Sequence, residues 1–437
     1  MQLERTAMKE LTAWKAHPHR KPMLLRGARQ TGKTWITERF AADHYDGLAR
    51  IDFMRDEAAK RIFEQDLDPQ RIIRYISALT KTPIQPNHTL IVFDEVQECP
   101  RALISLKYFC EEAPEYQIIA TGSYMGIASH QNDSFPVGKV DLLTLHPLTF
   151  MEFLRNAGEP MLASELDQGH VNDIDTIFGE KLRELLKLYM FVGGMPEAVS
   201  RYLEHENLDE TREVQRSILD TYDADFSKHA PIRLLERLRL TWNSIPAQLA
   251  RENRKFVYGL IRTGARAREF EECLQWLRDY GIITKVPCLS AIRKPLSAYA
   301  QLDTFKVYLV DTGLLGALSD LDSSVIAHED RLFTEFRGSL TEQYVCQQLV
   351  GHGLDPFYWA NPSARGTAEV DFVTTVGSQV TPIEVKAKTN LRAKSLHVAV
   401  EKYGIPKSVR TSLAGYRDEG WVINVPLWAI GALPSLM

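Results

Sequence analysis

The stretch MLLRGARQTGKT at residues 23–34 constrains the fold most strongly. Its second part, residues 27–34, fits the pattern GxxxxGK[ST] at every fixed position, and it lies between an apolar run and a helix-compatible run at residues 35–42. This order predicts a strand, a phosphate-binding loop and a helix, whereas a chance match in a glycine-containing loop would not require it. Glycines allow successive backbone N–H groups to point at phosphate oxygens, and the N-terminus of the helix favours negative charge.

Each residue of this loop is a candidate for binding a nucleotide. The eight positions are Gly27, Ala28, Arg29, Gln30, Thr31, Gly32, Lys33 and Thr34. Lys33 is expected to reach the β- and γ-phosphates and to act in catalysis, and the hydroxyl of Thr34 is expected to hold Mg²⁺. The predicted cofactors are therefore ATP and Mg²⁺.

A second constellation follows a continuous apolar run at residues 89–93, which is typical of a fully buried parallel strand. The run ends in Asp94 and Glu95. Buried carboxylates are costly unless they are hydrated, paired or bound to metal, so their place at a strand end indicates a function. In a P-loop ATPase this is the Walker B position, where Asp94 would hold Mg²⁺ and Glu95 would orient or deprotonate the attacking water. The alternative is a strand end that carries surface acids.

A further strand, residues 116–120, leads into Thr121, Gly122 and Ser123. Because strands of a doubly wound sheet present their carboxyl ends to the ligand, a hydroxyl there can sense the γ-phosphate or the water. Ser123 is the candidate sensor, with Thr121 as its substitute. A turn stabilised by a local serine hydrogen bond explains the same residues equally well.

Length and composition limit the class of protein. The chain has 437 residues, 44% of them hydrophobic and 25% charged, which is ordinary for a soluble globular protein of two to four domains. A net charge of −5 means that nucleic-acid binding would depend on local patches. The five cysteines are scattered, without CxxC spacing, as expected for thiols in a reducing cytosol. The N-terminus lacks the apolar region of a signal peptide, and apolar runs of about 18 residues are missing, so we expect a cytoplasmic protein without a membrane span.

Residues 151–230 are predicted to be mainly helical, with a helix at residues 181–194 closed by two glycines. We interpret this segment as a helical lid. Its arginines include candidates for a finger that reaches the γ-phosphate of a neighbouring subunit, although most surface arginines are simply solvated. The candidates are Arg183, Arg201, Arg212 and Arg216.

From about residue 231 the composition becomes basic. Residues 233–268 contain nine lysines or arginines but only two glutamates. A helix then ends at Gly281 and turns into a strand at residues 282–286. This order is usual for the third helix and wing of a winged helix, which would bind duplex DNA through phosphate contacts. A winged helix that contacts only protein is the alternative. Asp311, at the end of a later strand, is expected to cap a helix.

The C-terminal part carries a third set of candidate residues. Glu342 lies on a predicted helix, Asp371 on a strand, and Glu384 and Lys386 share one face of the next strand. Asp371 and Glu384 would hold one or two Mg²⁺, Lys386 would position the water or stabilise charge, and Glu342 would bind the metal directly or through water. Residues 380–410 add a second basic run, which suits a phosphodiester substrate. Alternating Glu and Lys at a sheet surface, or a fold that no longer cleaves, are the competing interpretations.

Together, GARQTGKT, LIVFDE, IIATGS, LHPLTFMEFL (145–154) and FVGGMPEAV (191–199) resemble a family of prokaryotic AAA-type P-loop ATPases. The C-terminal set resembles PD-(D/E)xK nucleases. The resemblance implies an α/β fold with an AAA-like parallel sheet at residues 1–150, a helical lid at 151–230, a winged helix at 231–325 and a restriction-endonuclease-like α/β domain at 326–437. It also implies a homo-oligomer.

The leading hypothesis is an ATP-hydrolysing protein that acts on nucleic acid, DNA in the first instance, through its winged helix and a C-terminal nuclease-like domain. The alternative is a regulatory NTPase switch whose nuclease-like domain is inactive and binds protein partners. Metal-dependent cleavage, or its absence, separates the two hypotheses.

Overall fold

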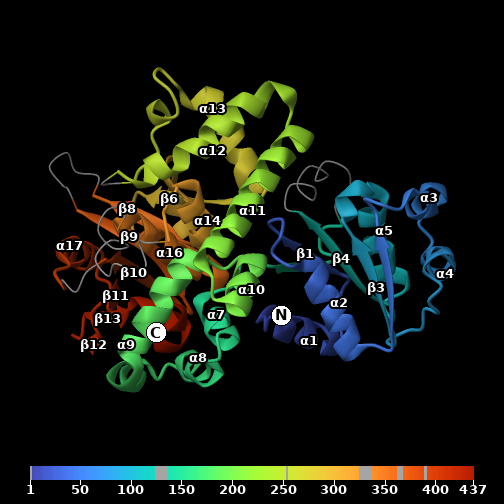
Figure 1. The fold of residues 1–437 in the computed structure, drawn as a ribbon, viewed down its shortest axis with the longest axis horizontal. Coiled ribbons are helices and arrows are strands. Elements are labelled where there is room, and N and C mark those ends of the chain that lie inside the picture. Colours follow the sequence, from blue (N-terminus) through green and yellow to red (C-terminus); the bar gives the residue numbers. More distant parts are fainter. Residues whose placement is uncertain (1, 124–135, 252–253, 324–336, 362–367, 388–390) are drawn as a thin grey trace. The chain divides into compact units, whose positions relative to one another are not determined.

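The computed structural model describes residues 2–123, 136–251, 254–323, 337–361, 368–387 and 391–437 (Figure 1). Its chain contacts define two compact units. Unit 2 contains Glu4–His146 and Asp279–Gly281, and unit 1 contains Met1–Leu3, Pro147–Arg278 and Ile282–Met437. Each unit is described by itself below.

Unit 2 is built on a parallel sheet of five strands in the order β2-β3-β4-β1-β5. The predicted apolar runs supply its central strands, as expected for strands that are covered on both faces. The strands are β1 (Met23–Gly27), β2 (Gly47–Asp52), β3 (Thr89–Asp94), β4 (Gln117–Ser123) and β5 (Asp141–Thr144). The α/β fold with a parallel sheet, which the family resemblance implied, is confirmed here.

Helices cover both faces of this sheet (Figure 1). Residues of α1 (Ala7–Ala16) and α2 (Lys33–His44) pack with Leu25, Val92 and Ile119 on one face. The other face is covered by α3 (Glu57–Gln65), α4 (Pro69–Thr80) and α5 (Pro100–Glu112), and a short 3₁₀ turn, η1 (Val96–Glu98), precedes α5. The two apolar layers fix the sheet, so the loops at its carboxyl edge have a rigid base.

The first part of unit 1 is helical, as predicted. Its helices are α7 (Phe150–Asn156), α8 (Pro160–Asp167), α9 (Val171–Val192), α10 (Pro196–His205), α11 (Leu208–His229), α12 (Leu235–Leu249) and α13 (Ala267–Asp279), with 3₁₀ turns η2 (Ile232–Leu234) and η3 (Tyr258–Leu260). Gly193 closes α9 with a φ of 73°, a value that favours glycine. The glycine pair predicted to end this helix therefore does so.

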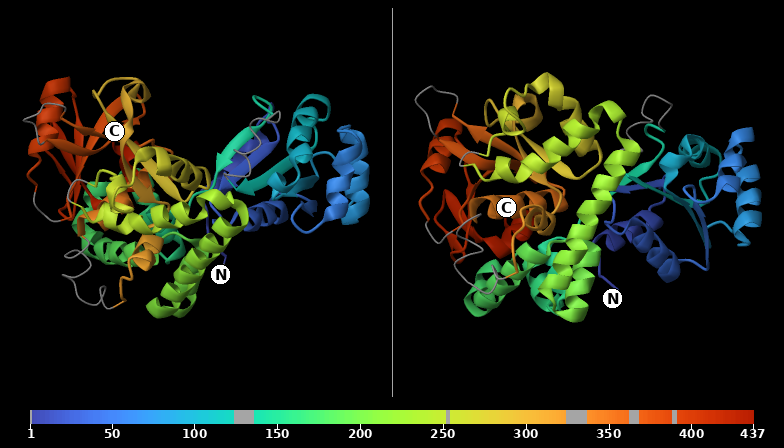
Figure 2. Two further views of the ribbon diagram at one scale, coloured as in Figure 1. Left: turned by 90° about the horizontal axis from the view of Figure 1, so that it is seen from above. Right: turned by 45° about the horizontal axis from the view of Figure 1, so that its top comes forward.

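A mixed sheet of eight strands, in the order β12-β13-β11-β10-β9-β8-β6-β7, forms the second part of unit 1 (Figure 2). Its strands are β6 (Ile283–Leu289), β7 (Ala300–Leu309), β8 (Phe357–Ala360), β9 (Glu369–Val376), β10 (Gln379–Val385), β11 (Ser408–Ser412), β12 (Arg417–Asp418) and β13 (Val422–Pro426). Its other elements are η4 (Leu296–Tyr299), α14 (Thr312–Leu318), α16 (Arg337–Gly351), α17 (Lys394–Tyr403), η5 (Leu427–Ala432) and α18 (Leu433–Leu436).

This sheet joins two segments that the sequence suggested were separate domains. The strand predicted as a wing is β6, which pairs antiparallel with β7 and parallel with β8. Strands from residues 231–325 and from residues 326–437 therefore share one sheet, and a winged helix is not established. Among the described helices, none combines the length and the apolar character needed to cross a bilayer.

Candidate nucleotide site and C-terminal carboxylate cluster

The phosphate-loop sequence forms a tight turn between β1 and α2. Gly32 has a φ of 90°, which a residue with a Cβ rarely adopts, so glycine is required at this position. A Cβ on Gly27 would lie 2.3 Å from the carbonyl oxygen of Leu145. Within the turn, the hydroxyl of Thr31 donates to the carbonyl oxygen of Ala28 at 2.9 Å. The geometry of the loop thus explains why both fixed positions of the motif are glycine.

Lys33 lies across this loop and is buried. Its ammonium donates to the carbonyl oxygens of Gly27 at 3.0 Å and Ala28 at 2.8 Å. Burial lowers the pKa of Lys33 to about 8, against an upward influence of the Glu95 carboxylate. An incoming phosphate would therefore compete with two carbonyls for this ammonium and would favour its charged form.

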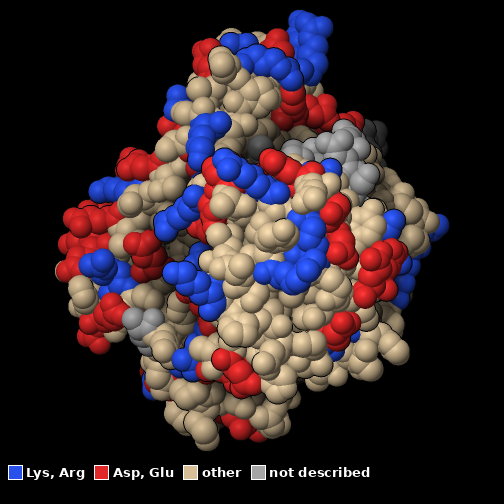
Figure 3. Space-filling model, turned by 90° about the vertical axis from the view of Figure 1, so that its right-hand side faces the viewer, with Lys and Arg blue, Asp and Glu red and all other residues tan. Residues whose placement is uncertain are grey.

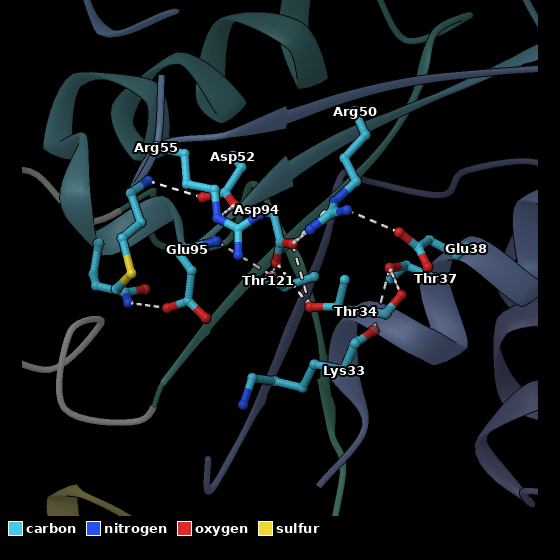
Figure 4. A network of polar contacts seen from close by, with 12 residues as sticks. Lys33, Thr34, Thr37, Glu38, Arg50, Asp52, Arg55, Asp94, Glu95 and Thr121 are labelled. Carbon is cyan, nitrogen blue, oxygen red and sulfur yellow. Dashed lines mark hydrogen bonds and ion pairs between the residues drawn. The ribbon is translucent and has the colours of Figure 1, made fainter. Parts of the chain in front are cut away.

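Asp94, at the end of β3, is the centre of a polar network (Figure 4). Its side chain is almost fully buried. Thr34 donates to it at 3.2 Å, and the hydroxyl of Thr121 donates to its other oxygen. The structure thus brings together the two residues predicted to hold Mg²⁺, Thr34 and Asp94. Thr121, named above as the substitute sensor, is the hydroxyl that reaches Asp94, whereas Ser123 is buried at the end of β4.

Arg50 also binds Asp94, and the sequence did not single it out. Its Nε and Nη2 atoms lie 3.1 and 2.5 Å from Asp94 Oδ2, and its Nη1 donates to Glu38 at 2.8 Å. Burial lowers the pKa of Arg50, but the hydrogen bond to Asp94 and the surrounding carboxylates raise it, and the net direction is upward. The pairing of β2 with β3, with Asp52 opposite Asp94, puts Arg50 beside the site. The contact of Arg50 with Asp94 could be predicted only from this strand register.

Glu95 leaves the line of the strand directly after Asp94. Its backbone is left-handed, with φ 52° and ψ 49°, an arrangement that is strained for a glutamate and recurs at functional sites. Its backbone N–H donates to the hydroxyl of Thr121 at 3.4 Å, and its carboxylate accepts a hydrogen bond from the amide of Gln97. The turn therefore separates the two carboxylates, so that Asp94 is held by donors and Glu95 is half-buried.

The C-terminal candidates also come together, in a buried cluster within unit 1. Glu342 comes from α16, Asp371 from β9 and Glu384 from β10. Burial raises the pKa of Asp371, and the neighbouring carboxylates of Glu342 and Glu384 raise it further. The backbone N–H of Val385 donates to Asp371 Oδ2 at 2.8 Å. Lys386 lies with Glu384, 2.5 Å between Nζ and Oε1, as the ExK spacing predicted.

Two cations that were not predicted for this cluster also lie in it. Lys306 of β7 is fully buried, with its Nζ 2.6 Å from Glu369 Oε1 and 3.6 Å from Glu342 Oε2. Arg254 lies 2.5 Å from Glu342 Oε1. Burial raises the pKa of Glu342, but Lys306 and Arg254 lower it, and the net direction is downward. Within the described ranges, no three His, Cys, Asp or Glu side chains have an arrangement that could hold a metal ion. The expected ligands are thus close together but paired with protein cations.

Arg254 corrects the interpretation of the first basic run, in which it was counted as a phosphate contact. Several other members of that run also pair with acids. The pairs are Arg233 with Glu272, Arg239 with Asp223 and Arg262 with Glu269. In the second run, Lys407 pairs with Asp418 and the buried Arg410 with Glu419. Lys388 lies outside the described residues. Acids from outside the two runs therefore offset part of their positive charge.

Two other predictions concern buried groups of unit 1. Arg212 is buried, with its guanidinium donating to Gln215 at 2.6 Å and to the carbonyl oxygen of Gly313 at 3.0 Å. It is therefore wrong as a candidate finger. The predicted capping role of Asp311 is confirmed, because its carboxylate accepts from the backbone N–H of Leu314 at 3.0 Å at the start of α14.

Comparison with known families divides the chain into three matches. Residues 19–154 match an AAA domain. Residues 183–325 match a domain of unknown function, DUF8612, and residues 337–429 match another, DUF4143. A search of curated protein sequences finds no significant match.

The solved structures that match the chain are distant from it in sequence. The Walker-type ATPase paby2304 of Pyrococcus abyssi is 15% identical, with a TM-score of 0.46, over 73% of this chain and 96% of that one. The Orc1 protein of Aeropyrum pernix, solved with DNA, is 14% identical, with a TM-score of 0.28, over 74% and 93%. Cdc6p of Pyrobaculum aerophilum is 14% identical, with a TM-score of 0.26, over 74% and 94%. The parallel α/β sheet, the phosphate loop and the domain match together identify residues 19–154 as similar to AAA-type P-loop ATPases.

Proposed function

We propose that unit 2 binds ATP with Mg²⁺ and hydrolyses it. The observation that carries this proposal is the contact of Thr34 with the buried Asp94, beside a lysine held across the phosphate loop. Mg²⁺ would neutralise phosphate charge when it is bound between these two oxygen donors. Lys33 would leave its two carbonyl partners for the phosphates.

Glu95 is proposed to orient or deprotonate the attacking water. Asp94 is unsuited to that role because Thr34, Thr121 and Arg50 already donate to it. The backbone of Glu95 turns in a different direction, and its carboxylate accepts a hydrogen bond from the neutral amide of Gln97. A carboxylate that the three donors of Asp94 do not engage can accept a proton from water.

ATP binding and turnover test this assignment. Lys33→Ala should lose nucleotide binding, because the phosphates lose their cation within the loop. Lys107→Ala is the matched control, since Lys107 is an exposed lysine on α5 of the same unit. Binding of ATP that is equal in Lys33→Ala and the control would contradict the proposed site.

We further propose that ATP turnover responds to nucleic acid. Three exposed arginines, Arg251, Arg266 and Arg268, support a local contact with phosphates. The test is the ATPase rate with single-stranded DNA, duplex DNA and RNA at low salt, compared with the Arg266→Ala/Arg268→Ala variant. If no nucleic acid changes the rate, the alternative of a regulatory switch that binds protein partners is favoured.

A homo-oligomer remains part of this proposal, with an arginine of one subunit at the phosphate of the next. Arg201 and Arg216 keep partly exposed side chains, at 42% and 58%. Arg216→Ala and Arg201→Ala should each be assayed for turnover and for mass in solution. Loss of turnover with unchanged nucleotide binding would identify the finger.

A further inference from the structure

The buried carboxylate cluster of unit 1 differs from the metal site that its sequence resembles. We infer that the ammonium of Lys306 and the guanidinium of Arg254 take the place of a divalent cation there, so that this part of the chain is complete without metal. The inference concerns unit 1 alone and does not depend on ATP hydrolysis by unit 2.

Lys306 is placed as an internal counter-ion. It projects from β7 with no exposed surface, between Glu369 at 2.6 Å and Glu342 at 3.6 Å. The ring of Tyr358 also faces it, with 4.9 Å from Nζ to the ring centroid. A buried ammonium is costly unless carboxylates surround it, and here they do. The lysine and the acids therefore require each other.

Arg254 reaches the same cluster through a gap left by a glycine. Its backbone has a φ of 48°, and a Cβ on Gly338 would lie 2.0 Å from its Nη2. Its Nη1 lies 2.5 Å from Glu342 Oε1. A residue with any side chain at position 338 would displace the guanidinium. The glycine at position 338 of α16 therefore leaves the space that the guanidinium of Arg254 occupies.

Four of the carboxylate oxygens that a metal would need are already engaged. Glu342 Oε1 is bound by Arg254, and Glu342 Oε2 accepts from the hydroxyl of Tyr308 at 2.9 Å. Asp371 Oδ2 accepts a backbone hydrogen bond, and Glu384 Oε1 is paired with Lys386. A divalent ion would have to displace these donors and lie beside two buried positive charges. Repulsion between buried like charges is strong, so the ion is excluded while Lys306 remains.

One oxygen shows where a cation would bind if Lys306 were removed. Glu384 Oε2 is buried and has no hydrogen-bond partner among the described residues. Lys306→Met keeps much of the side-chain volume but removes the charge. The lost charge leaves Glu342 and Glu369 without the ammonium that lies beside both of them, and a hard divalent ion could then replace it.

The test is a titration of the full chain with Mn²⁺ in the absence of nucleotide. The electron paramagnetic resonance signal of free Mn²⁺ measures how many ions are bound. Wild type and Glu384→Gln should bind the same number of ions, because the cluster binds none. Lys306→Met should bind one more ion per chain, and Lys306→Met/Glu384→Gln should lose it. Mn²⁺ should raise the melting temperature of Lys306→Met more than that of the wild type.

Two results would overturn the inference. Wild-type protein that binds one more Mn²⁺ than Glu384→Gln would show that the cluster holds metal beside Lys306. A folded Lys306→Met that gains no Mn²⁺ would show that Lys306 does not exclude it. If Lys306→Met fails to fold, the comparison of wild type with Glu384→Gln alone decides, since sites in unit 2 are the same in both.

Discussion

The pKa of Lys33 makes a direct prediction about how ATP affinity changes with pH. Burial lowers this pKa to about 8 in the nucleotide-free protein. The ammonium is then about nine-tenths charged at pH 7 and about one-tenth charged at pH 9. Phosphate groups are already ionised over most of this range. Because ATP binds the charged form, its apparent dissociation constant should rise roughly tenfold from pH 7 to pH 9.

Fluorescence titration with an ATP analogue at several pH values measures this change. Lys33→Arg is the matched variant, since a guanidinium stays charged throughout the range. Its affinity should not fall between pH 7 and pH 9, whatever its level. A flat profile in the wild type would refute the view that a buried, weakly basic Lys33 is the phosphate cation, and a tenfold loss in Lys33→Arg would assign the effect to another group.

Three shorter predictions each concern one side chain or one glycine. Arg50→Ala should lower the Mg²⁺ concentration needed for half-maximal ATP binding by roughly tenfold, because Arg50 competes for Asp94; an unchanged Mg²⁺ requirement would contradict this. Gly27→Ala should lower the free energy of unfolding by about 1–3 kcal/mol in a urea titration, because its Cβ would lie 2.3 Å from the carbonyl oxygen of Leu145. A stability equal to wild type would show that the loop can move to accommodate the methyl group. Asp311→Ala should cost at least about 3 kcal/mol in the same titration, about 1 for each of its three buried donors; a cost below about 1 would mean that the donors find other partners.

Three strands of the unit 2 sheet, β1, β3 and β4, were predictable because each carries a local signal. The apolar runs at β1, β3 and β4 end in residues whose chemistry requires an exposed loop or a ligand, and their order fixes the βα units. Arg50 was not predictable, because its role depends on β2 lying beside β3. Pairing of strands is non-local and leaves no mark in a window of sequence.

The C-terminal cluster illustrates the same limit. The pattern of Glu342, Asp371, Glu384 and Lys386 predicted which acids come together, and the structure agrees. It did not predict Lys306, a lone lysine in an apolar strand and distant from the cluster in sequence. Chemistry inferred from a motif therefore describes the ligands but omits the counter-ions supplied by other strands.

Composition also overstated the unpaired positive charge of the two basic runs, for a related reason. Composition counts charges, but acids from other segments, such as Asp223 and Glu419, pair with several of them. On the face drawn in Figure 3, lysines and arginines are interspersed with aspartates and glutamates. The proposed nucleic-acid contact would therefore depend on a few exposed arginines, not on the runs as a whole.

The central claim is that Asp94 and Glu95 divide the work of binding Mg²⁺ and activating water. Phosphate release at saturating ATP, measured for wild type and Glu95→Gln alongside ATP binding, tests it most directly. Glu95→Gln should bind ATP as tightly as wild type and turn it over roughly 10²–10⁴-fold more slowly, because the amide cannot accept the proton. Equal turnover in the two proteins would contradict the claim and remove Glu95 as the base.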